Sequence, residues 1–387
     1  MKQGWEYKKL GEVCEVVSGS TPKTNVPEYW GEGHYWVTPA ELNDTIVYID
    51  KTERQITDEA LTKTKLRLLP VGTVLLSSRA PIGKVAITKT EMYCNQGFKN
   101  CICSDSIYNK YLFYFLRLKK EYLNSLGRGA TFKEISKSIV ESISIPIPPK
   151  STQLTIVSEL DKINELIRLK KEQLKDYDNL AQSIFYEMFG DPVENEKGWE
   201  VKKIGEIGSV ERGAGISKKD FAEDGLPCIH YGQLHTILGA RTKKHYTSIP
   251  HNLLPKYKVA HTGDLVMAIT SEDVEGSCKS TAWLGNYDVI VGSDAAILHH
   301  EQDGTFLSYH TMTKAFYNEK AKYAKGFKVT HISTKEIEKI SVFLPPLPLQ
   351  HLFAQRIEQI EHQKSEVTKA ITDLETLLAS RMQHWFE

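Results

Sequence analysis

The 387-residue sequence lacks any run of about eighteen or more apolar residues, the length that a membrane-spanning helix needs. Its beginning, Met1–Leu10, also lacks the apolar core and the small-residue cleavage site of a secretory signal. We therefore expect a cytoplasmic protein. With 41% hydrophobic and 25% charged residues, the composition is that of an ordinary globular protein, long enough for two or three packed units.

Patterns for cysteine chemistry are missing as well. The six cysteines form no CxxC pair and show no Cys/His spacing suited to tetrahedral zinc. Cys101 and Cys103 alternate on one face of an expected strand, where buried reduced thiols are the favoured interpretation. We expect no metal site and no cofactor in this chain.

Motifs of the common catalytic sites are also absent. The sequence has no Asn/Asp-Pro-Pro-Tyr/Phe motif of an amino-methyltransferase, since its Pro-Pro pairs follow Ile147 and Leu344. No glycine-rich loop has the GxGxxG or Walker spacing, and the nearest run, Gly276–Ser280, lacks the glycine before Lys279. The thirteen histidines show no ligand-like spacing with carboxylates, which favours positions on the surface over metal or general-base roles. We expect a non-catalytic protein.

An excess of charge of either sign is missing over the whole chain, since the formal net charge is +0. The charge is nevertheless uneven: residues 1–150 carry +5, residues 195–349 carry +1, and the two remaining stretches together carry −6. Positive charge thus collects in the expected globular parts, most clearly the first. This distribution is compatible with a polyanionic partner that is bound with a modest electrostatic attraction.

An internal repeat is the strongest feature that the sequence does have. Gly4–Val13 matches Gly198–Ile207 with an offset of 194, and Ile135–Ile145 matches Ile332–Val342 with an offset of 197. The middles of the two halves agree only in pattern. Matching ends with diverged middles favour a protein whose two halves share a scaffold but differ in their contact surfaces, rather than a duplicated enzyme.

Each half ends in a long helical pattern whose seam positions alternate at spacings of four and three, which is typical of a coiled coil. The two series are Ile156, Leu160, Ile163, Ile167, Lys170, Leu174, Tyr177, Ala181, Ile184 and Met188, and Phe353, Ile357, Ile360, Lys364, Val367, Ile371, Leu374, Leu378, Arg381 and Trp385. Each seam thus contains a lysine, Lys170 or Lys364. Such a lysine either extends out of the seam to solvent, which is the favoured interpretation, or fixes the register at some cost in stability.

Short β runs and two helical patterns precede each long helix and predict an α+β fold. The β runs include residues 73–77, 84–88, 264–269 and 289–291, and the helical patterns cover about 110–126 and 306–324. Proline-rich turns mark where each β-rich part gives way to its helix. The expected boundaries are 1–150 for the first β-rich domain, 151–190 for the first long helix, 191–349 for the second β-rich domain and 350–387 for the second long helix.

Several short motifs carry a family resemblance. They are a Trp-x-x-Lys-Lys-Leu/Ile-Gly-Glu opening in each half, Val17–Pro22, Ser78–Lys84, Asn95–Phe98, Gly129 with Ile135–Ser136, and Ile147–Pro149 before a long helix. Together they resemble the specificity subunit of type I restriction-modification systems. The resemblance covers essentially the whole chain, twice over.

The resemblance implies two target recognition domains, each of which reads one half of a bipartite site in double-stranded DNA. Two antiparallel coiled-coil helices would separate them in a pseudo-twofold, quasi-circular arrangement, set the spacer and dock methylation subunits. The expected partners are two methylation subunits, which would carry S-adenosylmethionine, and translocase-nuclease restriction subunits, with no membrane partner. The second half departs from the family pattern at Ser271–Gly276 and Gly292–Ala295, so we expect the two domains to read different half-sites.

DNA contacts require Lys, Arg and backbone amides for phosphates, and Arg, Asn, Gln, Lys or Thr for base edges. Candidates in the first domain are Ser20, Thr21, Lys23, Arg54, Arg79, Lys84, Asn95, Gln96, Lys99, Arg128, Thr131 and Lys133, taken from expected loops and strand ends. Candidates in the second domain are Arg212, Lys218, Lys219, His230, Gln233, Arg241, Lys243, Lys244, His245, Lys279, Lys325, Lys328 and Thr330. Arg79, Asn95 and Gln96 are the best base-reading candidates.

Two other classes of function stay open at this point. The chain could be a coiled-coil scaffold whose β-rich parts bind protein or glycan partners, or an enzyme with an unrecognised site. Specific, salt-sensitive binding of a bipartite duplex would favour the DNA reader. A stoichiometric complex of the isolated chain with S-adenosylmethionine would favour the enzyme.

Overall fold

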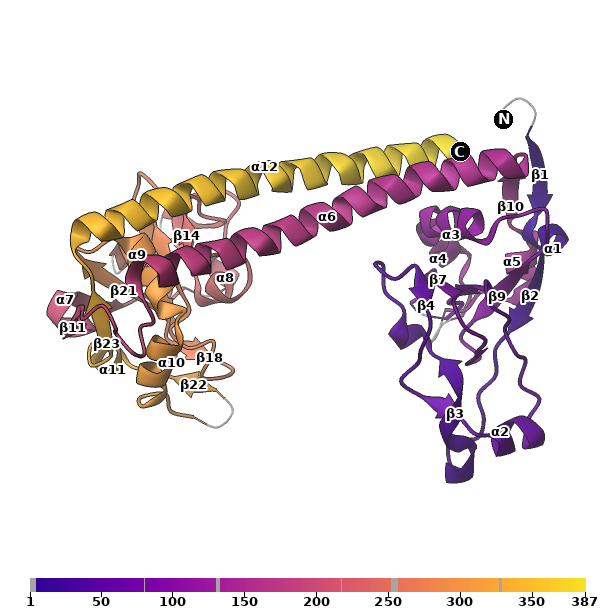
Figure 1. Cartoon of the computed structure of the whole chain (residues 1–387), viewed down its shortest axis with the longest axis horizontal. Coiled ribbons are helices and arrows are strands. Elements are labelled where there is room, and N and C mark those ends of the chain that lie inside the picture. Colours follow the sequence, from indigo (N-terminus) through magenta and orange to yellow (C-terminus); the bar gives the residue numbers. More distant parts are fainter. Residues whose placement is uncertain (1–4, 80, 130–132, 217, 252–256, 327–328) are drawn as a thin grey trace. The chain divides into compact units, whose positions relative to one another are not determined.

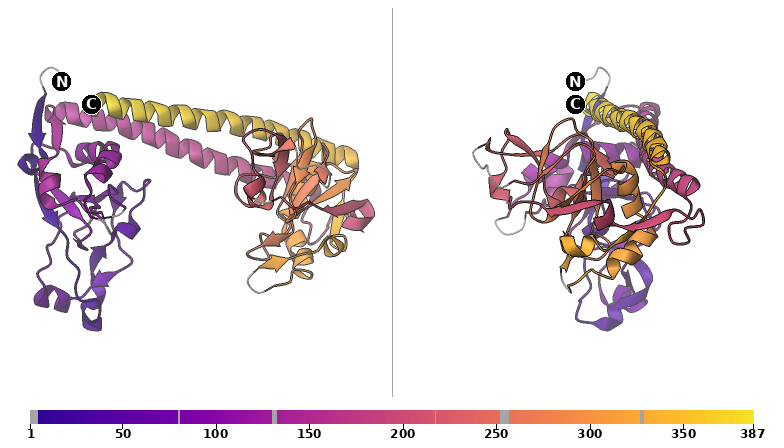
Figure 2. Two further views of the ribbon diagram at one scale, coloured as in Figure 1. Left: turned by 180° about the vertical axis from the view of Figure 1, so that it is seen from behind. Right: turned by 90° about the vertical axis from the view of Figure 1, so that its left-hand side faces the viewer.

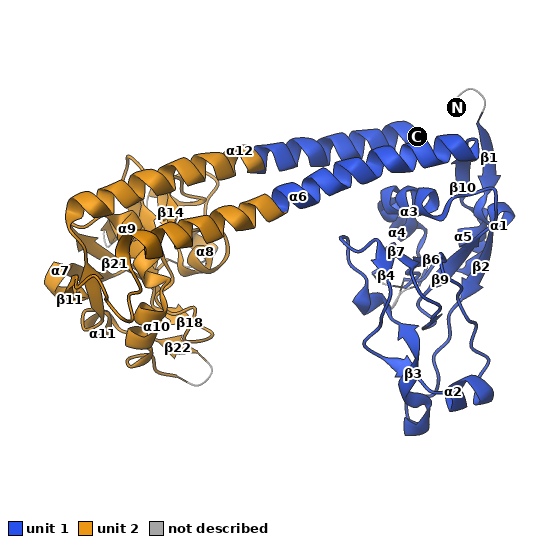
Figure 3. Ribbon diagram, in the orientation of Figure 1, with its two compact units in different colours: residues 1–171, 368–387 blue, residues 172–367 orange. Residues whose placement is uncertain are grey.

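Two compact units make up the structure, a computed structural model that describes residues 5–79, 81–129, 133–216, 218–251, 257–326 and 329–387. Unit 1 comprises Met1–Lys171 with Thr368–Glu387, and unit 2 comprises Glu172–Val367 (Figure 3). Each unit therefore contains a globular part and one end of each of two long helices. We refer to residues 5–147 and 199–344 as the globular parts of units 1 and 2.

The globular part of unit 1 is built on a sheet of order β2-β9-β6-β7-β4 and a smaller sheet of order β5-β3-β8 (Figure 1). Its first strand, β1, pairs antiparallel with its last, β10. The strands are β1 Glu6–Lys9, β2 Cys14–Ser18, β3 Trp30–Val37, β4 Tyr48–Ile49, β5 Gln55–Ile56, β6 Val74–Leu76, β7 Val85–Thr88, β8 Tyr93–Cys94, β9 Lys99–Cys103 and β10 Ser144–Ile147. The helices are α1 Leu10–Val13, α2 Asp58–Lys63, α3 Asn109–Leu118, α4 Lys120–Leu126 and α5 Lys137–Ser142, with short 3-10 turns at Pro27–Tyr29 and Pro39–Glu41.

The globular part of unit 2 repeats this topology strand by strand. Its sheet β12-β21-β17-β19-β14 corresponds to β2-β9-β6-β7-β4, its pair β11-β23 to β1-β10, and its strands β15-β13-β20 to β5-β3-β8, with β16 added at one edge. The strands are β11 Glu200–Lys203, β12 Gly208–Arg212, β13 Leu226–Ile229, β14 Arg241–Thr242, β15 Thr247–Ile249, β16 Val259–Ala260, β17 Leu265–Ala268, β18 Thr270–Ser271, β19 Ser280–Trp283, β20 Val289–Val291, β21 Ala295–His300, β22 Thr330–His331 and β23 Ser341–Leu344. The helices are α7 Ile204–Ile207, α8 Tyr231–Thr236, α9 Gly304–Thr311, α10 Lys314–Ala321 and α11 Thr334–Ile337, with a 3-10 turn at Lys218–Asp220. The repeat in the sequence is thus a duplication of the fold.

Side chains alternate between two hydrophobic clusters along the central strands of each unit. In β6, Val74 and Leu76 join the cluster that contains α3, whereas Leu75 joins the cluster on the opposite face of the sheet. In β17, Leu265 and Val266 are divided in the same way. Because neighbouring residues of a strand point to opposite faces, the central sheet of each unit is buried on both sides.

The structure confirms the predicted α+β fold with long helices, and the four predicted β runs contain β6, β7, β17 and β20. The two shorter helical patterns were predicted as single segments, but each forms two helices. Lys119 separates α3 from α4 with a ψ of 13°. Thr313 begins α10 by accepting a hydrogen bond from the Phe316 amide. Such an N-cap starts a new helix in a new direction, which the periodicity of apolar residues does not reveal.

The long helices are α6, Lys150–Phe189, and α12, Leu347–Phe386, with 40 residues each. In unit 1, Leu160 near the start of α6 lies in one hydrophobic cluster with Phe386 at the end of α12. In unit 2, Phe189 at the end of α6 packs against Phe353 near the start of α12, with ring centroids 5.4 Å apart. Figure 2 shows from two further sides that the segments of both helices run side by side within each unit.

The polar seam positions lie at the edge of the helix pair. Lys364 on α12 reaches Asp178 on α6 at 2.8 Å and Glu361 at 3.0 Å. Arg381 pairs with Glu159 on α6. The pair with Asp178 takes the cationic group of Lys364 out of the apolar seam and also links it to the other helix, so it fits both interpretations of a seam lysine. Among the described residues, no helix is both long and apolar enough to cross a membrane.

Candidate nucleic-acid interface

Four loops of unit 1 meet beside one end of the central sheet. We call them the unit-1 loop cluster: residues 19–23, 77–84, 95–98 and 128–134, of which residues 80 and 130–132 lie outside the described residues. Backbone hydrogen bonds join the loops, from Ser20 N to Cys94 O at 2.9 Å, from Ser78 N to Gly97 O at 2.7 Å and from Ile135 N to Ser78 O at 2.9 Å. Three of the loops follow strands of the two sheets, and the fourth, 128–134, lies between α4 and α5 and is joined to the second loop by the bridge between Arg79 and Glu134. The sheets and these bonds therefore position the cluster.

Glycine is required where two of these loops touch. A Cβ atom built at Gly19 would lie 1.9 Å from the carbonyl oxygen of Asn95. No side chain fits there without moving the backbone. Gly19 therefore brings Ser20 and Thr21 next to Asn95 and Gln96, and the Thr21 hydroxyl donates a hydrogen bond to the Gln96 side chain.

Arg79 is an exposed base-reading candidate, and an ion pair orients its side chain. Its Nε lies 2.8 Å from Oε2 of Glu134, and its side chain is 46% exposed. Burial alone would raise the pKa of Glu134, but hydrogen bonds from Arg79 and Lys99 hold that pKa below its usual value. The Nε contact uses one of the five N–H donors of the guanidinium, a group suited to bidentate contact with guanine.

An aromatic pair extends the unit-1 loop cluster toward Lys23 and Arg54. The Trp30 and Trp36 rings lie edge to face with centroids 4.8 Å apart, and the Arg54 guanidinium lies 3.8 Å from the Trp30 ring. The indole N–H groups donate to Lys23 O at 3.2 Å and to Ser20 O at 3.1 Å. The sequence argument missed both tryptophans, and their spacing could not have paired them, because the register of β3 shifts between Trp30 and His34.

The remaining unit-1 candidates are placed differently. Lys84 Nζ donates to Pro39 O at 2.9 Å, and Asn95 Oδ1 accepts from Gly97 N at 2.9 Å, so both side chains already support the loops. Arg128 and Lys133 are exposed. Lys99 is only 7% exposed and pairs with Glu134 at 3.2 Å, so it stabilises the cluster and does not face DNA.

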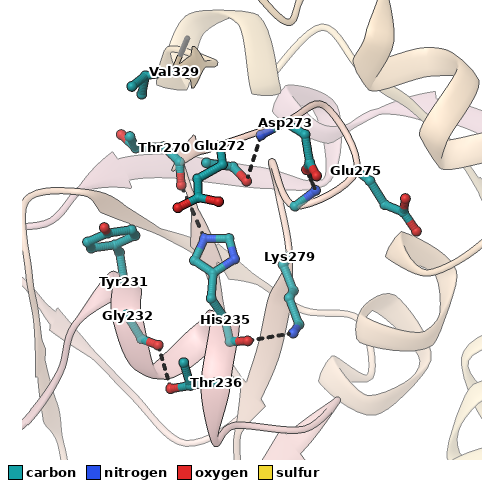
Figure 4. Close-up of a pocket in the computed structure, with 12 residues that line it drawn as sticks. Tyr231, Gly232, His235, Thr236, Thr270, Glu272, Asp273, Glu275, Lys279 and Val329 are labelled. Atoms are coloured by element: carbon teal, nitrogen blue, oxygen red, sulfur yellow. Dashed lines mark hydrogen bonds between the residues drawn. The ribbon is translucent and has the colours of Figure 1, made fainter. Parts of the chain in front are cut away.

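Unit 2 has a cleft of about 700 Å³ at the corresponding place, between α8 and the loop 271–279 (Figure 4). Tyr231 and His235 line it from α8, and Glu272 and Asp273 from the loop. His235 Nε2 lies 3.2 Å from Thr270 O, and Lys279 Nζ donates to His235 O at 3.2 Å. Carboxylate oxygens accept hydrogen bonds, so this surface suits the amino groups of cytosine or adenine better than a phosphate.

Backbone pairing shows which residues correspond in the two units. Arg79 bridges to Glu134 in unit 1, and Thr270 pairs with His331 in unit 2. The unit-1 ion pair is thus replaced by a contact of 3.3 Å between Thr270 Oγ1 and His331 Nδ1. The departure of Ser271–Gly276 from the family pattern was the signal for this different surface, although no residue of that run was among the candidates.

Three unit-2 candidates are corrected because the fold uses them internally. Gln233 is 4% exposed and its Oε1 accepts from the His230 amide in a helix cap. Thr330 is 5% exposed. The Arg241 side chain is 9% exposed and pairs with Glu358 on α12, so its charge is already neutralised. None of the three presents a free group to DNA.

Other unit-2 candidates lie on the surface with partners of their own. Arg212 Nε donates to Ser293 O at 2.8 Å, His230 stacks on Phe221 and His245 Nδ1 lies 2.6 Å from the Tyr287 hydroxyl. Five of the candidate lysines are exposed, namely Lys219, Lys243, Lys244, Lys279 and Lys325. Of these, Lys243 pairs with Glu358 and Lys325 with Glu336. Thr131 and Lys328 lie outside the described residues, as does the side chain of Lys218.

A family model described as the type I restriction modification DNA specificity domain matches this sequence twice, over residues 2–176 and 196–376. Each match contains a globular part and most of the long helix that follows it. Together the matches cover most of the chain.

The chain is also similar to proteins of Methanocaldococcus jannaschii. It is 39% identical over 235 residues to the type I restriction enzyme MjaIX specificity subunit, which covers 56% of this chain and 54% of that protein. It is 25% identical over 410 residues to the type I restriction enzyme MjaVIII specificity subunit, which covers 97% of this chain and 92% of that protein. The match to the MjaIX subunit thus spans about half of that relative's length.

Among solved structures, the fold is similar to a chain from a study of complex assembly and conformational transition of the type I R-M system. The TM-score is 0.66 and the sequence identity 20%, over 99% of this chain and 97% of that one. A specificity subunit from M. genitalium is similar with a TM-score of 0.53 and 14% identity. At these identities the likeness concerns the fold alone.

Proposed function

Because the chain belongs to the family of type I restriction modification DNA specificity domains, we propose that each unit reads its own half of a bipartite site in double-stranded DNA. Specificity subunits are the sequence-reading, non-catalytic members of type I systems, and this chain has that role. The observation that carries the proposal is the duplicated frame with unlike loops. One unit presents Arg79 where the other presents Thr270 and an acidic cleft. Two readers of different half-sites need this combination.

The long helices serve as the ruler of this reader. A helix of 40 residues is about 60 Å long. That length is sufficient to serve successive major-groove faces, whose centres lie roughly 34–36 Å apart. Inserting one heptad in both helices adds ~10.5 Å of rise. The preferred spacer should then lengthen by about 3 base pairs at ~3.4 Å each, and an unchanged spacer would refute this role.

The partners follow from the duplication. Two equivalent halves suit two copies of a methylation subunit, each of which brings S-adenosylmethionine and the methyl-transfer chemistry, while translocase-nuclease subunits join for restriction. The complex acts in the cytoplasm, where the DNA lies. Native mass spectrometry of the co-expressed complex tests the stoichiometry, and a single copy of the methylation subunit would contradict it.

The experiment that tests DNA reading is a retardation assay of the full-length chain, with its methylation subunits, on duplexes with bipartite sites. Mapping methylated adenines in cells that express the complex supplies the site. We expect specific retardation that weakens as salt rises and that is lost when either half-site is changed. Full discrimination with one half-site scrambled, or equal affinity for every duplex, would contradict the proposal and favour a scaffold that binds protein or glycan.

A further inference from the structure

Each globular part is attached to its long helix by a buried glutamine near the start of that helix. Gln153 on α6 is 1% exposed; its Oε1 accepts from Tyr108 N at 2.8 Å, and its Nε2 donates to Ser106 O at 2.9 Å. Gln350 on α12 is fully buried, and its Oε1 accepts from Asp303 N at 3.0 Å. The two glutamines differ by 197 positions, the offset of the repeat. They bind the loop before the first helix of each α3-α4 or α9-α10 pair.

An acidic residue eight positions further along each helix makes a second attachment. Asp161 on α6 accepts from Lys110 Nζ at 2.7 Å and from the Tyr114 hydroxyl at 2.6 Å, both on α3. Glu358 on α12 accepts from Lys243 Nζ at 2.7 Å and pairs with Arg241. Figure 1 shows α3 beside α6 and β14 beside α12.

The two acids occupy equivalent positions but have unrelated partners. Asp161 and Glu358 also differ by 197 positions, whereas their cations come from a helix in unit 1 and from β14 and the residue after it in unit 2. Hydrogen bonds from Lys243 and the charge of Arg241 hold the pKa of Glu358 below its usual value, against the effect of burial. The position of the acid on the helix is therefore common to both units, while the residues that pair with it differ.

Two attachment points fix an orientation that one point leaves open. Eight helical residues separate glutamine from acid by about 12 Å. The glutamine and the apolar residues beyond it, such as Ile156 and Ile357, hold the globular part on its helix. The acid adds a directional polar contact at the far end of this attachment, where a small rotation would be felt most. The loops that face DNA lie on the same rigid body as the cations, so a small rotation would move them along the duplex.

We propose that Asp161 and Glu358 are positioning residues that set the angle of each globular part on its helix and thereby sharpen the choice of spacer length. The proposal rests on the proposed DNA reading. In this proposal the helices set the preferred length of the spacer. The two ion pairs set how strongly spacers of other lengths are rejected. The bases read in each half-site are set by the loops and do not depend on Asp161 or Glu358.

The test uses the full-length chain with its methylation subunits and three duplexes: the preferred spacer, one base pair shorter and one base pair longer. In Asp161→Ala and in Glu358→Ala we expect the penalty for the wrong spacers to fall by roughly two- to fivefold, the range of partly exposed ion pairs. The penalty for a changed base within a half-site should stay the same. Glu165→Ala is the matched control, because Glu165 pairs with Arg168 on the same helix.

Other outcomes separate a positioning role from a structural one. Asp161→Glu should restore the spacer preference, because a carboxylate remains within reach of Lys110. An unchanged spacer profile in both alanine variants overturns the proposal, as does an equal loss of affinity on all three duplexes together with a lower melting temperature. A wild-type complex that shows no sequence preference would instead refute DNA reading itself.

Discussion

The recognition loops of unit 1 and unit 2 follow equivalent strands but carry charges of opposite sign. In unit 1, Arg79 is held by Glu134 and exposes a cation. In unit 2, the loop 271–279 offers Glu272 and Asp273 beside Tyr231. The difference teaches that the duplicated sheets fix only where a recognition loop lies. Its sequence then decides whether it donates or accepts hydrogen bonds.

The loops also differ in what supports them from the second helix of each pair. In unit 2, Lys320 is 4% exposed and donates to the carbonyl oxygens of Glu275 at 2.7 Å and Ser277 at 2.5 Å. Burial lowers the pKa of Lys320. In unit 1, the Asn124 amide donates to Ile82 O at 3.0 Å. A buried cation supports the acidic loop, and a neutral amide supports the basic one.

Removing the buried cation should give the largest effect. Lys320→Met leaves two carbonyl groups without their donor, so we expect the free energy of unfolding of unit 2 to fall by about 2–3 kcal/mol. Discrimination in the unit-2 half-site should fall with it, as measured by chemical denaturation and by binding to base-substituted duplexes. Asn124→Leu in unit 1 is the matched variant, with an expected cost of about 1 kcal/mol. If the Lys320→Met protein is destabilised but still discriminates between bases of the unit-2 half-site, Lys320 does not support the recognition loop as proposed.

Replacing the oriented cation of unit 1 should give the next effect. Arg79→Ala should cost about 1–3 kcal/mol of binding free energy and relax one base position of the unit-1 half-site, because a bidentate base contact is lost. Lys133→Ala, in contrast, should weaken binding to all sequences alike. Titration of both variants against a set of single-base substitutions measures the two patterns. An equal loss on every sequence for Arg79→Ala would remove Arg79 from the base-reading residues.

The smallest expected effect concerns the acidic half of a capping box, which α11 has and the equivalent helix α5 lacks, although both helices have a serine N-cap. Ser333 and Glu336 form a capping box at α11, whereas Ser136 in unit 1 is followed by Ile139 at the matching position. The hydrogen bond from Lys325, with those from Ser333, lowers the pKa of Glu336 from 4.5 to about 2. A lowered pKa stabilises the folded state above pH 4.5, and this contribution is lost as the pH falls toward about 2.

Glu336→Gln should therefore remove at most about 1 kcal/mol of stability above that range and leave little difference near its lower end. Chemical denaturation of both proteins across a series of pH values measures this. A difference in unfolding free energy that does not change with pH would show that Glu336 acts through packing and not through its charge.

The repeat, the long helices and the unlike loops could be predicted from the sequence because each leaves a local pattern. The seam of α6 and α12 shows as spacings of four and three, and residues such as Ile163 and Ile371 are buried as that spacing requires. Whereas the expectation of different half-sites stays a prediction, the divergence at Ser271–Gly276 coincides with a different surface in unit 2. Its acidic cleft could not be foreseen, since α8 supplies the opposite wall from a distant part of the chain.

Exposure of single charged residues could not be predicted, because it depends on partners far away in the sequence. Arg241 looks like a surface cation until Glu358 is placed next to it. Lys99 is buried because the loop 128–134 brings Glu134 over it. The Gln233 side chain accepts a hydrogen bond from the His230 amide in a helix cap, which is visible only once the backbone geometry is known. In each case the composition suits DNA binding, but the tertiary contact decides.

The end of α12 has a consequence for how the chain is made. Residues 368–387 complete unit 1: Trp385 stacks on Trp5 with centroids 6.3 Å apart, and Phe386 lies 5.0 Å from the Tyr111 ring. During synthesis, the core of unit 1 therefore receives its contribution from residues 368–387 only after all of unit 2 has been synthesised. Unit 2, which is contiguous in sequence, can finish folding earlier. The unit that begins first in the sequence is thus the one whose chain is completed last.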